Sequence, residues 1–85
     1  MARDYRVVID FEALDSLPRS GKRREVVISY LRELSQFAHL GGDFQLSDPE
    51  THRSFEVSIV AGYAVTWWID ASVHNAKVID IRSAN

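Results

Sequence analysis

Four side chains in the second half of the sequence have types suited to acting on a phosphate group or on a proton. Arg82 could clamp a phosphate, and Glu56 could serve as a general base on the same face of a sheet. Asp80 belongs to the same constellation, and His52 could transfer a proton because a free imidazole titrates near neutral pH. An alternative stays open for the same residues: Arg82 and Glu56 form a cross-strand ion pair, and His52 lies exposed in a loop.

The strongest concentration of positive charge is "RSGKRR", which contains Arg19, Lys22, Arg23 and Arg24. These cations stand where a long helix is expected to begin, and the free N–H groups of a helix start favour anions. The cluster could therefore bind a phosphate of RNA or a carboxylate of an acidic partner protein. The alternative is a solvated first helical turn whose charges are screened by salt.

Two adjacent tryptophans occur in "AVTWWID". Successive side chains of a strand point to opposite faces, so Trp67 is expected in the core and Trp68 on the opposite face. Trp68 could stack on a nucleobase, anchor a partner protein or be covered by a long side chain of its own molecule. Arg53 directly precedes the neighbouring strand, and we group it with Trp68 as an RNA- or partner-binding residue.

The sequence favours neither a metal site nor a small-molecule cofactor. It has no cysteine, and its histidines at positions 39, 52 and 74 do not have the spacing of metal ligands. It also contains no phosphate-binding glycine loop, nucleophile elbow or dinucleotide-binding fingerprint. We therefore expect no metal and no cofactor.

The composition is that of a single small domain over residues 1–85. Hydrophobic residues make up 46% and charged residues 26%, which excludes a disordered chain. The net charge is −2, and residues 43–85 carry three Lys or Arg against six Asp or Glu. This balance counts against general nucleic-acid binding, because such proteins are usually basic. The absence of cysteine, of a signal-like start and of a membrane-spanning stretch predicts a cytoplasmic protein without membrane contact.

Hydrophobic spacing predicts an α+β fold with one strand, two helices and then a three-stranded antiparallel meander. The first strand covers residues 5–11 and is followed by a short helix that begins at "FEAL". The long helix covers residues 22–38, and residues 43–53 are expected to form a polar turn. The meander consists of strands at residues 55–60, 63–70 and 77–82. We expect the helices to pack on one face of a mainly antiparallel sheet.

Alternation assigns each strand residue to one face of the sheet. The helix-facing side is expected to hold Tyr5, Val7, Ile9, Phe55, Val57, Ile59, Tyr63, Val65, Trp67, Ile69, Ile79 and Ile81. The opposite side is expected to hold Arg6, Val8, Asp10, Glu56, Ser58, Ala64, Thr66, Trp68, Asp70, Val78, Asp80 and Arg82. The candidate chemical groups would therefore share the exposed face.

Three stretches and the order of the elements resemble the RelE/ParE superfamily of toxins from bacterial type II toxin–antitoxin systems. The stretches are "YRVVIDFEALDSL", "FEVSIVAGYAVTWWID" and "AKVIDIR". The resemblance implies a RelE/ParE-like fold, a cognate antitoxin protein as partner and a role in plasmid stabilization. It also implies growth inhibition, in one branch by ribosome-dependent cleavage of messenger RNA and in another by inhibition of DNA gyrase.

In the RNA-cleaving branch, cations on the exposed sheet face hold the RNA and stabilise charge at the scissile phosphate. Here the matching positions carry Glu56, Ser58 and Ala64, and Arg82 keeps a cation on that face. Two hypotheses follow. The first is a translation-blocking ribonuclease that uses Arg82, Glu56 and His52. The second is a non-catalytic binding protein of the same fold, either a gyrase-type inhibitor or a degenerate toxin kept for partner binding.

Overall fold

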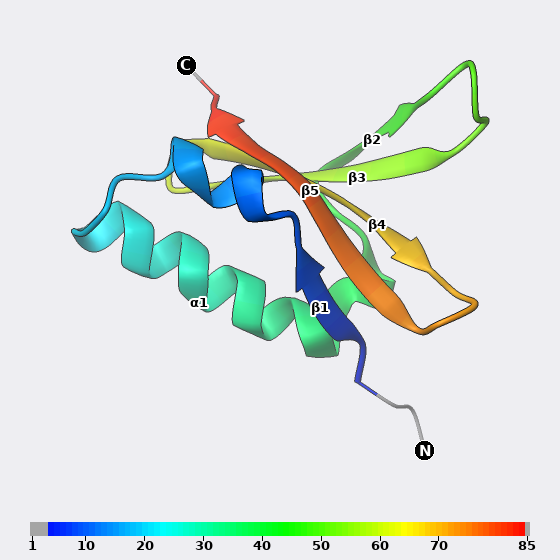
Figure 1. Cartoon of the computed structure of the whole chain (residues 1–85), viewed down its shortest axis with the longest axis horizontal. Coiled ribbons are helices and arrows are strands. Elements are labelled where there is room, and N and C mark those ends of the chain that lie inside the picture. The colour runs from blue at the N-terminus through cyan, green and yellow to red at the C-terminus, as the bar shows by residue number, and fades with distance from the viewer. Residues whose placement is uncertain (1–3, 85) are drawn as a thin grey trace.

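The computed structural model describes residues 4–84, which form one five-stranded sheet with helices packed against it (Figure 1). The elements in chain order are β1 (Arg6–Ile9), η1 (Phe11–Ser16), α1 (Lys22–Phe37), η2 (Ala38–Leu40), β2 (Phe44–Ser47), β3 (Ser54–Val60), β4 (Tyr63–Asp70) and β5 (Asn75–Ser83). The strands lie in the order β1-β5-β4-β3-β2, and β1 runs parallel to β5 while the other neighbours are antiparallel. The predicted α+β class is confirmed, but the predicted number of strands is wrong.

The additional strand is β2, which lies within the segment expected to be a polar turn. β2 pairs antiparallel with β3, so that Phe44 lies opposite Val57 and Leu46 opposite Phe55. Asp43 extends this pairing, because its N–H donates to the Val57 carbonyl at 2.8 Å and its Oδ2 accepts from the Ile59 N–H at 2.7 Å. β3 is therefore an interior strand of the sheet and not an edge.

The long helix forms where the apolar stripe predicts it. Val27, Leu31 and Leu34 are buried, and these positions share one face of α1. Before α1, the Asp10 side chain accepts the N–H of Glu12 at 3.1 Å and caps η1, as expected for an aspartate at that position. After α1, η2 ends at Gly41, whose φ of 79° is a backbone conformation that favours glycine.

The predicted faces of β3 are reversed in the structure. Val57 lies opposite Thr66 and Ile59 opposite Ala64, and directly opposed residues point to the same side of a sheet. Phe55, Val57 and Ile59 therefore face away from α1, on the side that we call the outer face. Glu56 and Ser58 instead pair with Trp67 and Val65 and point toward the helix, on the inner face. The assignment of Phe55, Val57 and Ile59 to the helix-facing side was wrong.

The predicted faces of β5 are correct at Ile81 but wrong at Val78 and Ile79. The register between β4 and β5 shifts at Thr66–Trp67, where Thr66 pairs with Asp80 and Trp67 with Val78. Ile79 is the extra residue of this β-bulge. As a result, Val78 is 1% exposed and Ile79 is 38% exposed. A strict alternation along β5 predicts the reverse for both residues.

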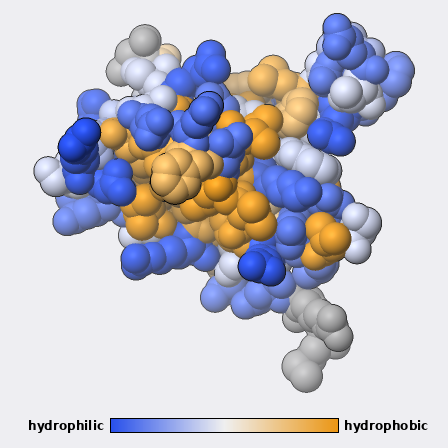
Figure 2. Space-filling view, viewed as in Figure 1, coloured by the Kyte–Doolittle hydropathy of each residue, from blue (hydrophilic) through white to orange (hydrophobic). Residues whose placement is uncertain are grey.

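The core lies between α1, η1 and the inner face of the sheet. Trp67 is fully buried in it, as predicted, together with residues of β4 and β5: Val65, Ala76, Val78 and Ile81. Ala13 and Leu17 close the core from the side of η1. Figure 2 shows that apolar side chains also reach the surface over η1, β1 and α1. No helix within residues 4–84 is long and apolar enough to cross a membrane.

Candidate interaction surface

The structure separates the residues that were expected to act together. Arg82 lies on the outer face, opposite Ala64, and its Nε forms an ion pair with Asp80 Oδ2 at 2.6 Å. Glu56 lies on the inner face, opposite Trp67. The prediction that Arg82 and Glu56 form an ion pair is therefore wrong. The two groups also cannot act on one substrate atom, because they lie on opposite faces of the sheet. Arg82 and Asp80 do share a face, as predicted.

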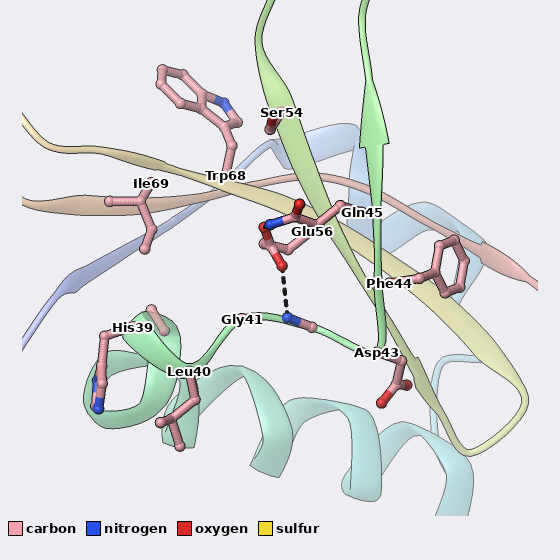
Figure 3. A pocket seen from close by; sticks show the side chains of 12 residues that line it. His39, Leu40, Gly41, Asp43, Phe44, Gln45, Ser54, Glu56, Trp68 and Ile69 are labelled. Carbon is pink, nitrogen blue, oxygen red and sulfur yellow. Dashed lines mark hydrogen bonds between the residues drawn. The ribbon is translucent and has the colours of Figure 1, made fainter.

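Both carboxylate oxygens of Glu56 are held by the chain itself. Oε1 accepts the N–H of Gly42 at 2.9 Å, and Oε2 accepts the side-chain amide of Gln45 at 2.6 Å. Figure 3 shows Glu56 turned toward the Gly41–Gly42 segment, whereas Trp68 and Phe44 point away from it. This arrangement fastens the segment after η2 to β3, which gives Glu56 a structural role.

His52 lies in the loop between β2 and β3, away from Arg82. Its backbone has a φ of 57°, and its N–H donates to the Asp48 carbonyl at 2.8 Å. Asp48 organises this loop: hydrogen bonds from the Glu50 N–H and then from the Thr51 hydroxyl lower the pKa of its carboxyl. The exposed loop position expected as the alternative for His52 is the one observed.

Trp68 lies on the outer face, as predicted, and side chains of its own molecule cover its ring. The Arg53 guanidinium carbon stands 4.0 Å from the ring centroid, and Lys77 Nζ stands 5.1 Å from it. Such positions are favourable cation–π contacts. Lys77 is also paired with Asp70 at 2.8 Å. A nucleobase or a partner side chain would therefore have to displace or stack on Arg53 to reach this ring.

The largest unforeseen feature is an apolar surface on the outer face, which we call the outer patch. It consists of Phe44 and Leu46 from β2, Ile59 from β3 and Ala64 from β4, and Val57 of β3 lies beneath them at 2% exposure. Phe44, Leu46 and Ile59 are each about half exposed, at 47%, 51% and 46%. A depression of about 470 Å³ lies over the patch, and Thr66, Asp80 and Arg82 form part of its wall. The alternation of apolar and polar residues in "FQLS" was the available signal for this strand.

The basic cluster of Arg19, Lys22, Arg23 and Arg24 gathers at the start of α1. Arg24 Nη1 donates to the Pro18 carbonyl at 3.2 Å, which holds the cluster against the preceding loop. The start of α1 and the loop between β2 and β3 lie at opposite sides of the molecule in Figure 1. The cluster therefore does not join Arg53 and Trp68 in one surface.

A hollow lies below Glu56. It has a volume of about 530 Å³ and is bordered by η2, Gly41–Gly42 and the adjoining ends of β3 and β4 (Figure 3). Its carboxylates, Glu56 and Asp43, are both engaged by backbone N–H groups. Within residues 4–84, no group of three or more His, Cys, Asp or Glu side chains is arranged to hold a metal ion.

Comparisons with known proteins do not assign this chain to a family. No model of a protein family matches it, and no curated protein matches it either.

Proposed function

We propose that this protein acts by binding another protein through the outer patch and does not cleave RNA. On the basis of its resemblance to the RelE/ParE superfamily, the protein would be a component of a cytoplasmic toxin–antitoxin module. The outer patch would then contact its cognate antitoxin or its target. The observation that carries the proposal is the exposure of Phe44, Leu46 and Ile59 on one side of the sheet. Contiguous exposed apolar residues with a polar rim are typical of protein-binding sites.

The charges of the outer face support a protein partner over RNA. Arg82 is paired with Asp80, and Lys77 is paired with Asp70. Each of these two cations is thus offset by a carboxylate beside it, which lowers its attraction for a phosphate backbone. The Arg82–Asp80 pair fits a polar rim, because it stands at the wall of the depression over the outer patch.

The ribonuclease hypothesis has less support. Its proposed base, Glu56, lies on the inner face with both oxygens hydrogen-bonded, whereas its proposed phosphate clamp lies on the outer face. His52 is held in a separate loop. General acid–base catalysis requires the groups to reach one substrate at hydrogen-bond distance, and these three side chains do not converge.

The proposal is tested by expressing the chain alone in a bacterial host while growth and messenger-RNA ends are followed. We expect growth arrest without new messenger-RNA ends. Leu46→Lys should abolish the arrest, because it places a charge in the outer patch at a side chain that is 51% exposed. Arg82→Ala should retain it. Leu40→Lys is the matched control, because Leu40 is 71% exposed on η2 outside the patch.

Three results would contradict the proposal. New messenger-RNA ends that disappear with Arg82→Ala would establish the nuclease instead. Growth arrest that persists with Leu46→Lys would remove the outer patch from the mechanism. The absence of any arrest, with the folded protein present in the cells, would remove the toxin role.

A further inference from the structure

A second surface, separate from the outer patch, is formed by the open edge of β1. β1 ends the sheet, so only one of its sides is paired. The N–H groups of Arg6 and Asp10 donate to the carbonyls of His74 and Val78, at 3.2 and 2.8 Å. Backbone groups of successive residues point to alternate sides of a strand. The N–H and carbonyl groups of Val7 and Ile9 therefore point away from the sheet.

The open edge carries few of the features that prevent strand pairing. β1 is short, but it contains no proline and no lysine, and its pairing with β5 has no bulge. The helix occupies the edge only at its beginning, where the Tyr5 N–H donates to the Ser35 carbonyl at 2.7 Å. Beside Val7 and Ile9 runs a groove of about 360 Å³, whose other wall is formed by Ile28, Leu31, Arg32 and Ser35 of α1.

The residues along this edge are self-complementary. In the sequence Arg6-Val7-Val8-Ile9-Asp10, a cation and an anion stand at equal distances from Val8. Arg6 and Asp10 are about 13 Å apart along the strand, so they cannot pair within one chain. Arg6 has no ion pair within residues 4–84, and Asp10 uses only Oδ1, for the cap of η1.

We propose that two copies of this chain associate through antiparallel pairing of β1 with β1, centred on Val8. In this register Arg6 of each copy lies opposite Asp10 of the other, and Val7 of each copy lies opposite Ile9 of the other. Val8 faces Val8 at the twofold axis. Two cross-strand ion pairs then form on the outer face, where such pairs stabilise strand association.

The hydrogen-bonding groups agree with the same register. In an antiparallel ladder, alternate opposed pairs exchange both backbone hydrogen bonds. The pairs that would do so here join Val7 of one copy to Ile9 of the other, and these are the residues whose backbone groups point outward. Moving the register by two residues places Val8 opposite Arg6 or Asp10, and both charge pairs are lost. A second copy is therefore the occupant that this edge fits, and the contact is closed by its twofold symmetry.

The test is the mass of the protein in solution, measured by sedimentation equilibrium over a range of concentrations. The unaltered chain is expected to dimerise. Arg6→Asp and Asp10→Arg should each weaken the dimer by about tenfold or more, because each places like charges opposite one another twice. An equimolar mixture of the two variants should recover association as a heterodimer, since each chain then meets the opposite charges.

The mixture keeps the test independent of folding defects. Asp10→Arg also removes the cap of η1, but a misfolded variant would not regain affinity on mixing. Asp15→Arg is the matched control: it makes the same charge change on η1, away from β1, and should leave the dimer unchanged. A chain that is monomeric at all concentrations, a dimer that both variants leave intact, or a mixture that does not recover association would overturn the proposal. None of these results depends on the outer patch.

Discussion

The hydroxyl oxygen of Tyr30 on α1 lies 2.6 Å from Oγ of Ser58 on β3. Ser58 is 5% exposed and is the one buried polar residue among the core positions described in residues 4–84. The contact shows how a serine can occupy the inner face of the sheet: the helix supplies its hydrogen-bond partner. It also explains why β3 can present Val57 and Ile59 to the outer face.

Removal of one partner of this hydrogen bond should destabilise the fold. Tyr30→Phe and Ser58→Ala are each expected to lower the free energy of unfolding by about 1–3 kcal/mol, because the remaining hydroxyl loses its partner in a poorly hydrated site. The double variant should lose clearly less than the sum of the two, since no unpaired hydroxyl is left. Urea unfolding of the four proteins measures this coupling. Strictly additive losses would show that the two hydroxyls do not interact.

The sequence allowed the helices and the tryptophan faces to be predicted, because those features follow from local spacing. Val27, Leu31 and Leu34 mark the buried face of α1 without reference to any other element. The faces of β3 are different. Alternation divides its residues into two sets, but local spacing does not decide which set meets the helix when each set contains apolar residues. That choice depends on Tyr30, which lies 28 residues from Ser58 in the sequence, and on the pairing of β3 with β2, which alternation within β3 does not reveal.

The candidate site was less predictable than the fold for the same reason. Arg82 and Glu56 were brought together by an assumed face of β3, and the faces of Val78 and Ile79 were reversed by an assumed unbroken alternation in β5. The bulge at Ile79 has no proline or glycine to mark it. Phe44 and Leu46 were assigned to a turn because "SDPE" follows them directly and draws attention to its turn residues. The outer patch requires both the pairing of β2 with β3 and the correct face of β3, so neither strand alone allows it to be predicted.

A close backbone approach makes Gly42 difficult to replace. A Cβ atom at this position would stand 2.6 Å from the Val57 carbonyl oxygen, which is backbone and cannot rotate away. Gly42→Ala should therefore lower the free energy of unfolding by about 1–3 kcal/mol, as for other overpacked sites. It should also weaken the Gly42–Glu56 hydrogen bond that fastens this segment.

Thermal unfolding followed by circular dichroism compares Gly42→Ala with Gly21→Ala. Gly21 has a φ of 106°, but a Cβ there meets no atom within 4 Å. Its replacement reports backbone strain alone, at about 1–3 kcal/mol, because its φ of 106° and ψ of 176° form a conformation that is essentially restricted to glycine. If Gly42→Ala left the unfolding temperature unchanged, the close approach to Val57 would not be a constraint on the fold.

Asp70 should make stability depend on pH in the acid range. Hydrogen bonds from Lys77 and then from Ser72 lower the pKa of its carboxyl from the usual 3.8. Because the unfolded chain then binds more protons than the folded one, stability in this range rises with pH. The contribution is fully present above pH 3.8 and is lost as the pH falls through the lowered folded-state pKa.

Asp70→Asn should therefore reduce stability at neutral pH and give a shallower decline on acidification. Urea unfolding between about pH 5 and pH 2 measures both effects. Asp48→Asn should act in the same direction, since its carboxyl pKa is also lowered. Asp15→Asn is the control, because Asp15 lies exposed on η1 outside both hydrogen-bond networks. An acid decline of unchanged slope in both Asp70→Asn and Asp48→Asn would contradict this account.

The cover over Trp68 can be tested through tryptophan fluorescence. Trp67 is fully buried, so quenching by acrylamide reports mainly on Trp68. Arg53→Ala removes the guanidinium 4.0 Å from the Trp68 ring, and we expect stronger quenching together with a loss of about 0.5–1 kcal/mol in unfolding free energy. Lys77→Ala should have a smaller effect on quenching, because Lys77 Nζ stands farther away, at 5.1 Å. Trp68→Phe supplies the baseline from Trp67, and quenching in Arg53→Ala equal to that of the unaltered chain would mean that Arg53 does not shield the ring in solution.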